Sequence, residues 1–458
     1  MLLAAFLKII AAWEPVFAQV RSFRRAQRQA LGLLICLGRR TLSRIIWTNG
    51  GQQRSWSGEY FLYSRAPWDP QQLFTPILKQ AMAYCPGPLV GVAVDDTRLR
   101  KTGRCIPQAS YHRDPLSPPF HTNLMLGLRF LQASLLLPLH RSSDQDARAL
   151  PIRFESVPVV KKPGKRADDK ARQQYQQERK RNNLSRHFVA MMKTLLELWK
   201  QTVGSEKILV FAGDGSFCNR TVLTNIPPGA HLIARTRKDA VLCLPAPPGS
   251  RCFYAPEKFT PEQVRQDESR DWKTTQIFYG GQWRPIRYKE IHQVLWQGGG
   301  RRRLLRLFVI APTPYRKRKS GRLYYRQPAY LLTTLTEGHS EELLQIYFDR
   351  WQIEVNHREE KDTLGVGQAQ MWNPISVPKQ PSLAVACYSA LLLASLQAFG
   401  PQRGTAYAAL PKWRRKARRP SCLDLVTLLR KDMVENQELL QSLDIQLSDR
   451  SLHAAAAA

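Results

Sequence analysis

The sequence is short of acidic residues and lacks any paired-cysteine motif. It holds 36 Asp and Glu residues against 69 Lys and Arg residues, which gives a formal net charge of +33 and a pI of about 10.2. This balance predicts a polyanionic partner, because neutralising phosphates releases their counterions. Ribosomal and membrane-surface proteins are also basic, but they tend to be short or to carry one basic tail. The eight cysteines include no C-x-x-C pair, which disfavours a zinc site and predicts scattered, reduced thiols.

Long uninterrupted apolar runs are also absent. Residues 120–139 approach the length of a membrane span, but polar residues interrupt them, so one long strand or two adjacent strands explain them better. The first thirteen residues resemble the apolar part of a signal peptide, but Lys8 and Glu14 bound them and no clean cleavage site follows. We expect an amphipathic helix there and no transmembrane segment. The glycines at 298–300 lack a following Gly-Lys-Ser/Thr, which excludes a P-loop.

The most informative stretch is IYFDRWQIEVNHREEKDTLG, at residues 346–365. Tyr347, Arg350, Glu354 and Lys361 are spaced 3, 4 and 7 residues apart. At about 100° per residue they share one face of a helix, within about 60° of arc. A carboxylate flanked by an Arg, a Lys and a phenol can hold a metal ion and grip phosphates. A solvated polar face would show the same spacing, although apolar residues in the stretch indicate that the helix packs against a core.

This stretch resembles the signature helix of DDE transposases from bacterial insertion sequences, in the subgroup defined by Tyr-x2-Arg-x3-Glu-x6-Lys. All four positions match. The family carries two aspartates upstream, each at the end of a strand. The apolar run in LVGVAVDDTRLRKTG (89–103) ends at Asp95 and Asp96, and the run in KILVFAGDGSFCNR (207–220) ends at Asp214. Such runs predict buried strands, and a carboxylate at the end of a strand is placed to act rather than to pack. Each Asp alone could instead cap a turn or a helix.

The resemblance implies that Asp96, Asp214 and Glu354 are the catalytic residues and bind two Mg²⁺ ions, for which Mn²⁺ can substitute. Carboxylate oxygens suit hard divalent cations, and two such ions can activate a nucleophile and stabilise a leaving oxygen. Asp95 is the rival for the first position. We prefer Asp96 because the family places this ligand directly before Thr. Only one of the two can face the site easily, because side chains alternate along a strand.

The expected fold class is α/β, with a ribonuclease-H-like catalytic core, a β-rich insertion and helical regions at both ends. Strands are predicted at 89–95, 105–111, 120–137, 207–212, 230–236, 274–279, 285–296, 301–313 and 329–335, with a long helix at 170–203. The expected regions are a helical DNA-binding domain (1–80), the first part of the core (86–240), the insertion (241–328), the second part of the core with the signature helix (329–375), and a helical C-terminal region (376–458).

Two basic regions outside the core are candidate DNA contacts. A helix that ends near Gly38 is followed by a second helix that Thr41 can cap. With Arg39, Arg40 and Arg44 this pair could read DNA, although a plain helical hairpin with a basic surface is equally compatible. The second region is the cluster PKWRRKARRPS at 411–421, where the candidate residues are Lys412, Arg414 and Arg415.

Within the core, the resemblance implies that Tyr347, Arg350 and Lys361 position the phosphates of the DNA end. It also implies an aromatic residue in the insertion that stacks on a flipped base. Trp283 and Trp296 are the candidates; either could instead belong to the core, which we favour for Trp296.

The resemblance further implies the reaction and its partners. Water first attacks the phosphodiester at the end of the element, and the freed 3′-hydroxyl then attacks target DNA, which is typical of cut-and-paste transposition and usually proceeds through a hairpin. The implied partners are double-stranded terminal inverted repeats, target DNA and a second copy of the chain on DNA, in the nucleoid-associated cytoplasm of a bacterium. A domesticated DNA-binding protein and a nuclease without joining of paired ends remain as alternatives.

Overall fold

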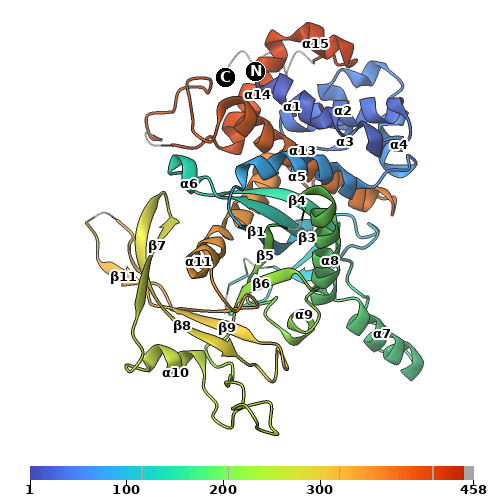
Figure 1. Cartoon of the computed structure of the whole chain (residues 1–458). Coiled ribbons are helices and arrows are strands. Elements are labelled where there is room, and N and C mark those ends of the chain that lie inside the picture. The colour runs from blue at the N-terminus through green and yellow to red at the C-terminus, as the bar shows by residue number, and fades with distance from the viewer. Residues whose placement is uncertain (115–116, 119, 205, 319, 415–416, 448–458) are drawn as a thin grey trace.

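The computed structural model describes residues 1–458 except 115–116, 119, 205, 319, 415–416 and 448–458. A helical region built from both ends of the chain lies on a large mixed sheet, and helices cover both faces of that sheet (Figure 1). This mixed α/β architecture is consistent with a ribonuclease-H-like fold.

Within the described residues ten strands form the sheet, in the order β2-β3-β1-β5-β6-β12-β9-β8-β7, with β4 also paired to β3. The central strands β1, β5 and β6 are parallel, whereas all the other pairs are antiparallel. The strands are β1 (Leu89–Arg100), β2 (Ser110–Arg113), β3 (Leu124–Leu137), β4 (Arg148–Ser156), β5 (Ile208–Gly213), β6 (Ala230–Arg235), β7 (Lys273–Tyr279), β8 (Gln282–Val294), β9 (Leu305–Ile310) and β12 (Ala329–Thr333).

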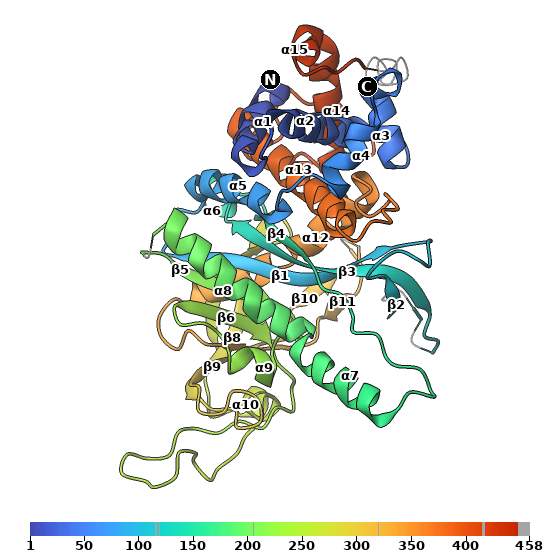
Figure 2. The same ribbon diagram turned by 90° about the vertical axis from the view of Figure 1, so that its right-hand side faces the viewer.

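Two faces of the central strands bury two different sets of side chains. On β1, Val92 and Val94 pack in the core that includes Phe188 of α8 (Leu184–Thr202), whereas Ala93 packs with Ile346 and other residues of the later helices. Helices α8 and α9 (Arg220–Leu223) therefore cover one face, and α11 (Ser340–Asp349) and α12 (Gln352–Arg358) cover the other. Figure 2 shows α8 lying across the central strands.

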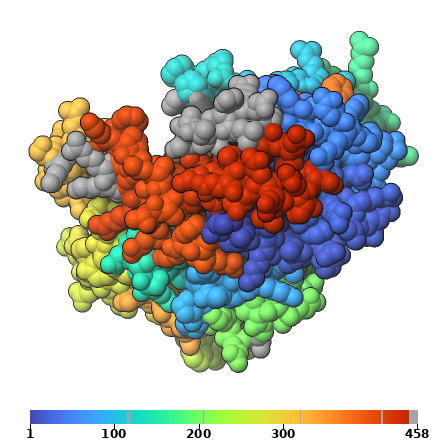
Figure 3. All heavy atoms as spheres, turned by 90° about the horizontal axis from the view of Figure 1, so that it is seen from above, coloured from blue at the N-terminus to red at the C-terminus, as the bar shows by residue number. Residues whose placement is uncertain are grey.

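The helical region joins the two ends of the chain. Helix α1 packs against α13 and α14, and the amide of Leu3 donates to Asp432 at 3.0 Å. Figure 3 shows the first and last segments adjoining on this surface. The apolar start of the chain is thus a buried helix, as expected. The helices are α1 (Leu2–Ala11), α2 (Val20–Ile35), α3 (Leu42–Thr48), α4 (Ser57–Ser64), α5 (Phe74–Ala81), α13 (Ser376–Phe399), α14 (Cys422–Glu435) and α15 (Gln437–Ser442).

Among the described residues, only α13 is long and apolar enough to cross a membrane. Buried residues make up 83% of its most apolar window, which is typical of the central helix of a folded core. The run at 120–139, which also approached the length of a span, is largely the strand β3.

The β-rich stretch continues the core sheet. Strands β7, β8 and β9 extend the sheet through β12, which pairs with β6 of the core. Three further elements belong to this part of the chain: the short helix α10 (Pro261–Gln266) and the separate hairpin of β10 (Pro314–Arg316) and β11 (Leu323–Tyr325).

Three features of the secondary structure were predicted wrongly or missed. The strand predicted near 105–111 is β2, which spans only Ser110–Arg113. The helix predicted over 170–203 is two helices, α7 (Asp169–Arg181) and α8, because Asn182 leaves helical geometry and Asn183 caps α8 through its side chain. Strand β4 was not predicted. Its sequence contains Pro151, which pairs with Ser134 of β3. The register of the two strands shifts there, between Ala133 and Ser134.

Candidate catalytic site

The site forms where the parallel pairing of β1 with β5 ends. These strands pair in register, with Ala93 opposite Ala212. Asp95 and Asp214 each follow two residues later, so they occupy equivalent positions and point to the same side. That side also holds Ala93 and Ala212, which pack against the helices α11 and α12.

Asp96 points to the opposite face of the sheet. Its carboxylate accepts from Arg129 Nε at 2.8 Å and lies 3.5 Å from Arg98 Nη2. By alternation it follows Val92 and Val94, which pack in the core under α8. Asp95, and not Asp96, therefore shares a face with Asp214 and the signature stretch, which favours Asp95 over our preferred Asp96 as a candidate ligand.

The signature stretch is not one regular helix. Helix α11 ends at Asp349, α12 begins at Gln352, and a π-helical turn follows at Glu359–Thr363. The uniform spacing that we assumed is therefore only approximate. The four residues nevertheless gather on the side of the carboxylates: Arg350 Nη2 donates to Glu354 Oε1 at 3.1 Å, and Lys361 lies on the π-helical turn, a feature that is frequent at functional sites.

The charge of Asp95 on β1 interacts with the charges of Arg350 and Lys361 in the signature stretch. Burial and the negative charges of Asp214 and Asp96 together raise the pKa of Asp95 to about 7, whereas Arg350 opposes the shift. Burial lowers the pKa of Lys361, and the nearby Asp95 counters this effect.

Tyr347 lies among the same charged groups. Burial raises the pKa of its phenol, and the neighbouring Asp214 and Glu354 add to this shift. Arg350 and Arg235 lower the pKa and oppose these effects. One region therefore gathers the carboxylates from two strands and a helix, the phenol and two guanidinium groups.

Buried polar contacts fix the signature stretch on the sheet. Gln132 of β3 donates to Glu360 Oε1 at 3.0 Å, and Asn356 donates to Ser134 Oγ at 3.2 Å. The Tyr388 hydroxyl of α13 donates to Asn356 Oδ1 at 3.2 Å. All five side chains are buried, so these bonds set the position of α12 and of the turn that carries Lys361.

The donor set fits a hard divalent cation in kind, because Asp95, Asp214 and Glu354 offer carboxylate oxygens. A bound cation would also relieve the repulsion that raises the pKa of Asp95. In the described parts of the chain, no three His, Cys, Asp or Glu side chains already stand close enough to hold a metal ion. Glu354 forms an ion pair with Arg350. The three carboxylates can therefore hold a metal ion once Glu354 breaks this ion pair.

The N-terminal candidates for DNA contact differ in exposure. Arg39 is exposed, but Arg40 is buried: its Nε donates to Leu33 O at 2.9 Å, and its amide donates to Gln368 at 2.7 Å. Arg40 therefore joins the helical region to the loop after the signature stretch. Arg44 is half-buried and donates to Leu37 O at 3.2 Å. Of the three, Arg39 is the most exposed and Arg40 is the one that is buried.

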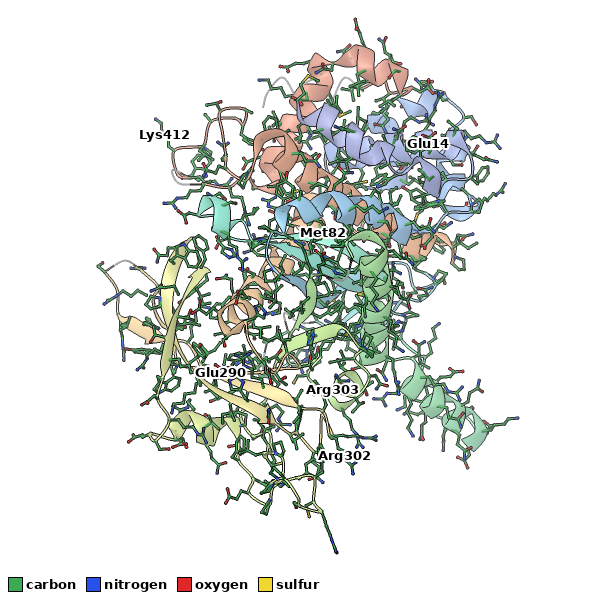
Figure 4. The ribbon with its side chains drawn as sticks, in the orientation of Figure 1. Glu14, Met82, Glu290, Arg302, Arg303 and Lys412 are labelled. Carbon is green, nitrogen blue, oxygen red and sulfur yellow. The ribbon has the colours of Figure 1, made fainter. Side chains whose placement is uncertain are left out.

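The C-terminal candidates lie on a loop beside the signature stretch. Lys412 and Arg414 are exposed, and Lys412 reaches outward in Figure 4, whereas Arg415 lies outside the described residues. Arg419 anchors this loop, since its Nη1 donates to Gln352 at 3.2 Å and to Ala147 O at 3.0 Å. The basic loop is therefore attached to α12, which carries Glu354.

The two tryptophan candidates lie in different settings. The ring of Trp283 is 47% exposed; it packs edge-on against His140 and Phe278, and its Nε1 donates to Asp144 at 3.3 Å. Trp296 is partly buried against the main core, as we favoured. It also lines a cavity of about 830 Å³ beside the site. The other lining residues are Gly215, Cys218, Arg235, Thr236, Arg237, Lys238, Asp239, Glu262, Arg265, Pro312, Gln327, Pro328 and Tyr330.

Arg235 and Glu360 were not predicted from the sequence. Arg235 ends β6, the neighbour of the strand that precedes Asp214, and it lies near Tyr347. A basic residue at the end of a predicted parallel strand is a signal that could have found it. Glu360 gives no such signal, because an acidic residue in a charged stretch reads as exposed, and only the packing against Gln132 reveals that it is buried.

The comparisons with known proteins agree with this geometry. A family model described as DDE superfamily endonuclease matches residues 15–303, which is more than half of the chain. The match includes Asp95 and Asp214 and ends before Glu354. No curated protein matches the chain. Endonucleases of this family cleave nucleic acid and typically use divalent metal ions. The chain belongs to the DDE superfamily of endonucleases.

Proposed function

We propose that the protein is a cut-and-paste DNA transposase of a bacterial insertion sequence, of the Tyr-Arg-Glu-Lys subgroup. The observation that carries this proposal is the placement of Asp95 and Asp214 two residues beyond the last parallel pair of β1 and β5, on the face covered by the helix of Glu354. Family membership supports an endonuclease acting on DNA, and the four signature residues support the narrower assignment.

In this proposal, Asp95, Asp214 and Glu354 hold two Mg²⁺ or Mn²⁺ ions. When bound, such ions lower the pKa of an attacking water and stabilise the leaving oxygen. The protein residues place the DNA. Arg350 exchanges its bond to Glu354 for a phosphate, and its rigid fork suits two phosphate oxygens. The Tyr347 hydroxyl and the Lys361 ammonium group add a hydrogen bond and a point charge.

The same site serves both chemical steps. Water attacks the phosphodiester at the end of the element, the P–O3′ bond breaks and a 3′-hydroxyl is released. This hydroxyl then attacks a phosphodiester of the target and forms a new P–O3′ bond, while the target strand releases its own 3′-hydroxyl. The protein forms no covalent bond with DNA, so the enzyme must keep the cleaved end in place between the steps.

Exposed basic residues outside the site support contacts with the terminal inverted repeats and the target. Arg39 lies on one side of the helical region, and Lys412 and Arg414 lie on the loop attached to α12. Two ends must be held together for both 3′-hydroxyls to reach one target, so the active form is a homodimer on DNA. Native mass measurement with and without end DNA tests this point: joining by a complex that holds one chain would contradict it.

The test of the reaction uses the full chain, Mg²⁺ and a supercoiled plasmid that carries the DNA flanking its own gene on both sides. We expect excision of the segment between inverted repeats and its joining to new sites, both absent with Glu354→Gln. Cleavage without joining would favour a nuclease. Binding without cleavage would favour a domesticated DNA-binding protein.

A further inference from the structure

Helix α7 has no core to pack against. None of its 13 residues is buried, and it projects from the body of the molecule on the side of α8 (Figures 1 and 2). At about 1.5 Å per residue, the helix is about 20 Å long. A surface helix normally keeps one apolar stripe against its own protein, so packing within this chain does not explain the position of α7.

Local interactions hold α7 in helical form. Asp168 caps its first turn, where its Oδ1 accepts from the amide of Ala171 at 2.8 Å. Asp169 lies in the first turn and three basic residues lie in the last, so the charges at both ends interact favourably with the helix dipole. Gln174 donates to Glu178, one turn further on, at 3.1 Å. A helix of this length is nevertheless marginally stable without tertiary packing, and a partner that binds it would stabilise it.

The charge of this part of the chain selects the kind of partner. Residues 161–181 include three acidic residues, two alanines and one aromatic residue, Tyr175. They also include nine basic residues, all of them exposed: Lys161, Lys162, Lys165, Arg166, Lys170, Arg172, Arg179, Lys180 and Arg181. A protein partner would need an apolar stripe to bury, which these residues do not provide. Their charge instead complements a polyanion.

The helix begins to project at the edge of the sheet that carries the candidate catalytic residues. Ser185, in the first turn of α8, lies four residues beyond the end of α7. Asn219 Nδ2 donates to Ser185 Oγ at 2.9 Å and to Ser216 O at 2.7 Å. The Ser216 hydroxyl in turn donates to Asp214 Oδ1 at 2.6 Å. A short chain of hydrogen bonds therefore connects the base of α7 to the loop that holds Asp214.

The other candidate DNA contacts near the site lie on a different side. Lys412 and Arg414 belong to the loop attached to α12, on one face of the sheet, whereas α7 leads into α8, on the other face. Figures 1 and 4, which share one orientation, show Lys412 and α7 on opposite sides of the molecule. DNA bound along the loop would thus leave α7 accessible to a second duplex. Joining needs such an arrangement, because the element end and the target must meet at one set of carboxylates.

We propose that α7 and the segment before it, residues 161–168, form an arm that binds target DNA along its phosphates. Lys and Arg contacts with phosphates carry no sequence information, which suits a target whose sequence varies. At about 3.4 Å per base pair, the helix spans about six base pairs. This inference rests on the proposed function for the role of the DNA as a target, but not for the binding of duplex DNA by the arm.

The first test measures binding of a short fluorescent duplex of random sequence, without divalent metal and across a range of salt. In the variant K170Q/R179Q/R181Q, we expect the slope of log K against log salt to fall by about 2 to 3, at about 0.9 for each lost phosphate contact. The matched control is K79Q/K193Q/K200Q, which removes three exposed charges of α5 and α8 and should leave the slope nearly unchanged. Gln has a helix propensity close to those of Lys and Arg, and circular dichroism and melting temperatures show whether the fold is kept.

The second test separates the target from the element end. A pre-cleaved end with a free 3′-hydroxyl is joined to a supercoiled plasmid in Mg²⁺. The α7 variant should need a target concentration at least about tenfold higher to reach the wild-type rate of joining, whereas its single-turnover cleavage of an uncleaved end should be unchanged. The control variant should match the wild-type protein in both reactions.

The outcomes distinguish the arm from the proposed function. An unchanged salt slope in the α7 variant, or an equal loss in both variants, would overturn the arm. Equal weakening of cleavage and joining in the α7 variant would place the arm on the element end and overturn its assignment to the target. If only the α7 variant loses slope but the wild-type chain neither cleaves nor joins DNA, the arm still binds duplex DNA and the proposed function falls.

Discussion

Asp95 and Asp214 occupy equivalent positions just past the point where β1 and β5 stop pairing, two residues beyond the paired Ala93 and Ala212. Burial, Asp214 and Asp96 together raise the pKa of Asp95. Negative groups held this close together are unfavourable by themselves, and such perturbed carboxylates are typical of functional sites. Their positions follow from the register of β1 and β5, so the sheet itself builds the site.

The choice between the adjacent aspartates can be tested directly. Asp95→Asn should lower strand cleavage by at least about 1000-fold, because a metal ligand supports several kcal/mol of transition-state stabilisation. Asp96→Asn should retain cleavage but lower the melting temperature, because Arg129 and Arg98 lose their carboxylate partner. The two measurements are single-turnover cleavage and thermal unfolding. The opposite pattern, with Asp96→Asn inactive and Asp95→Asn active, would restore our first preference.

Removal and exchange of the metal should separate binding from chemistry. We expect cleavage in Mg²⁺ or Mn²⁺, none in a chelator, and none in Ca²⁺, whose looser coordination misplaces the reacting oxygens. DNA binding should persist in all four conditions, because the basic surfaces do not depend on the metal. A gel-shift assay in parallel with the cleavage assay checks both statements. Undiminished cleavage in the chelator would refute the role assigned to the three carboxylates.

The buried Glu360 predicts a distinct pH dependence of stability. Burial raises its pKa in the folded chain to about 8, from an ordinary value of 4.5. Between these values the folded chain holds a proton that the unfolded chain has released, so the free energy of unfolding falls as pH rises. Gln cannot ionise but can still accept from Gln132. The stability of Glu360→Gln relative to wild type should therefore rise with pH, by at most about 1.4 kcal/mol per unit, and level off above pH 8.

Urea unfolding of the two proteins at several pH values between 5 and 8.5 measures this difference. Asp349, whose pKa burial raises to about 8, and His357, whose pKa burial lowers to about 3, titrate in both proteins and cancel in the comparison. A difference that stays constant across the range would mean that Glu360 is ionised in the folded chain.

The sequence predicted the central strands and the signature helix because their patterns are local. Apolar runs that end in Asp mark β1 and β5, and the residue spacing marks one face of the signature stretch. The sequence could not show which of the two side chains, Asp95 or Asp96, points toward the signature stretch. Strand β1 is buried on both faces from Leu89 to Val94, so no alternation of polar and apolar residues shows which face meets the helix. That face is set by register and packing.

Other features depended on contacts distant in sequence. Strand β4 was missed because Pro151 and its charged neighbours hide the pattern. Arg148 is nevertheless buried there, and it donates to Pro420 O at 2.7 Å. Arg40 was interpreted as a DNA contact, yet its partner Gln368 comes from 328 residues further along the chain. Charge in a sequence predicts exposure, and only the tertiary structure reveals which charges are buried in contacts.

The most direct test of the account is single-turnover strand cleavage by Asp214→Asn, because Asp214 belongs to the site whichever aspartate of β1 acts with it. The substrate is a labelled duplex from the DNA flanking the gene, in Mg²⁺, at protein concentrations that saturate binding. We expect wild-type affinity for the duplex and cleavage reduced by at least about 1000-fold. Cleavage by Asp214→Asn at a rate close to that of the wild-type protein would contradict the assignment of this site as the catalytic centre.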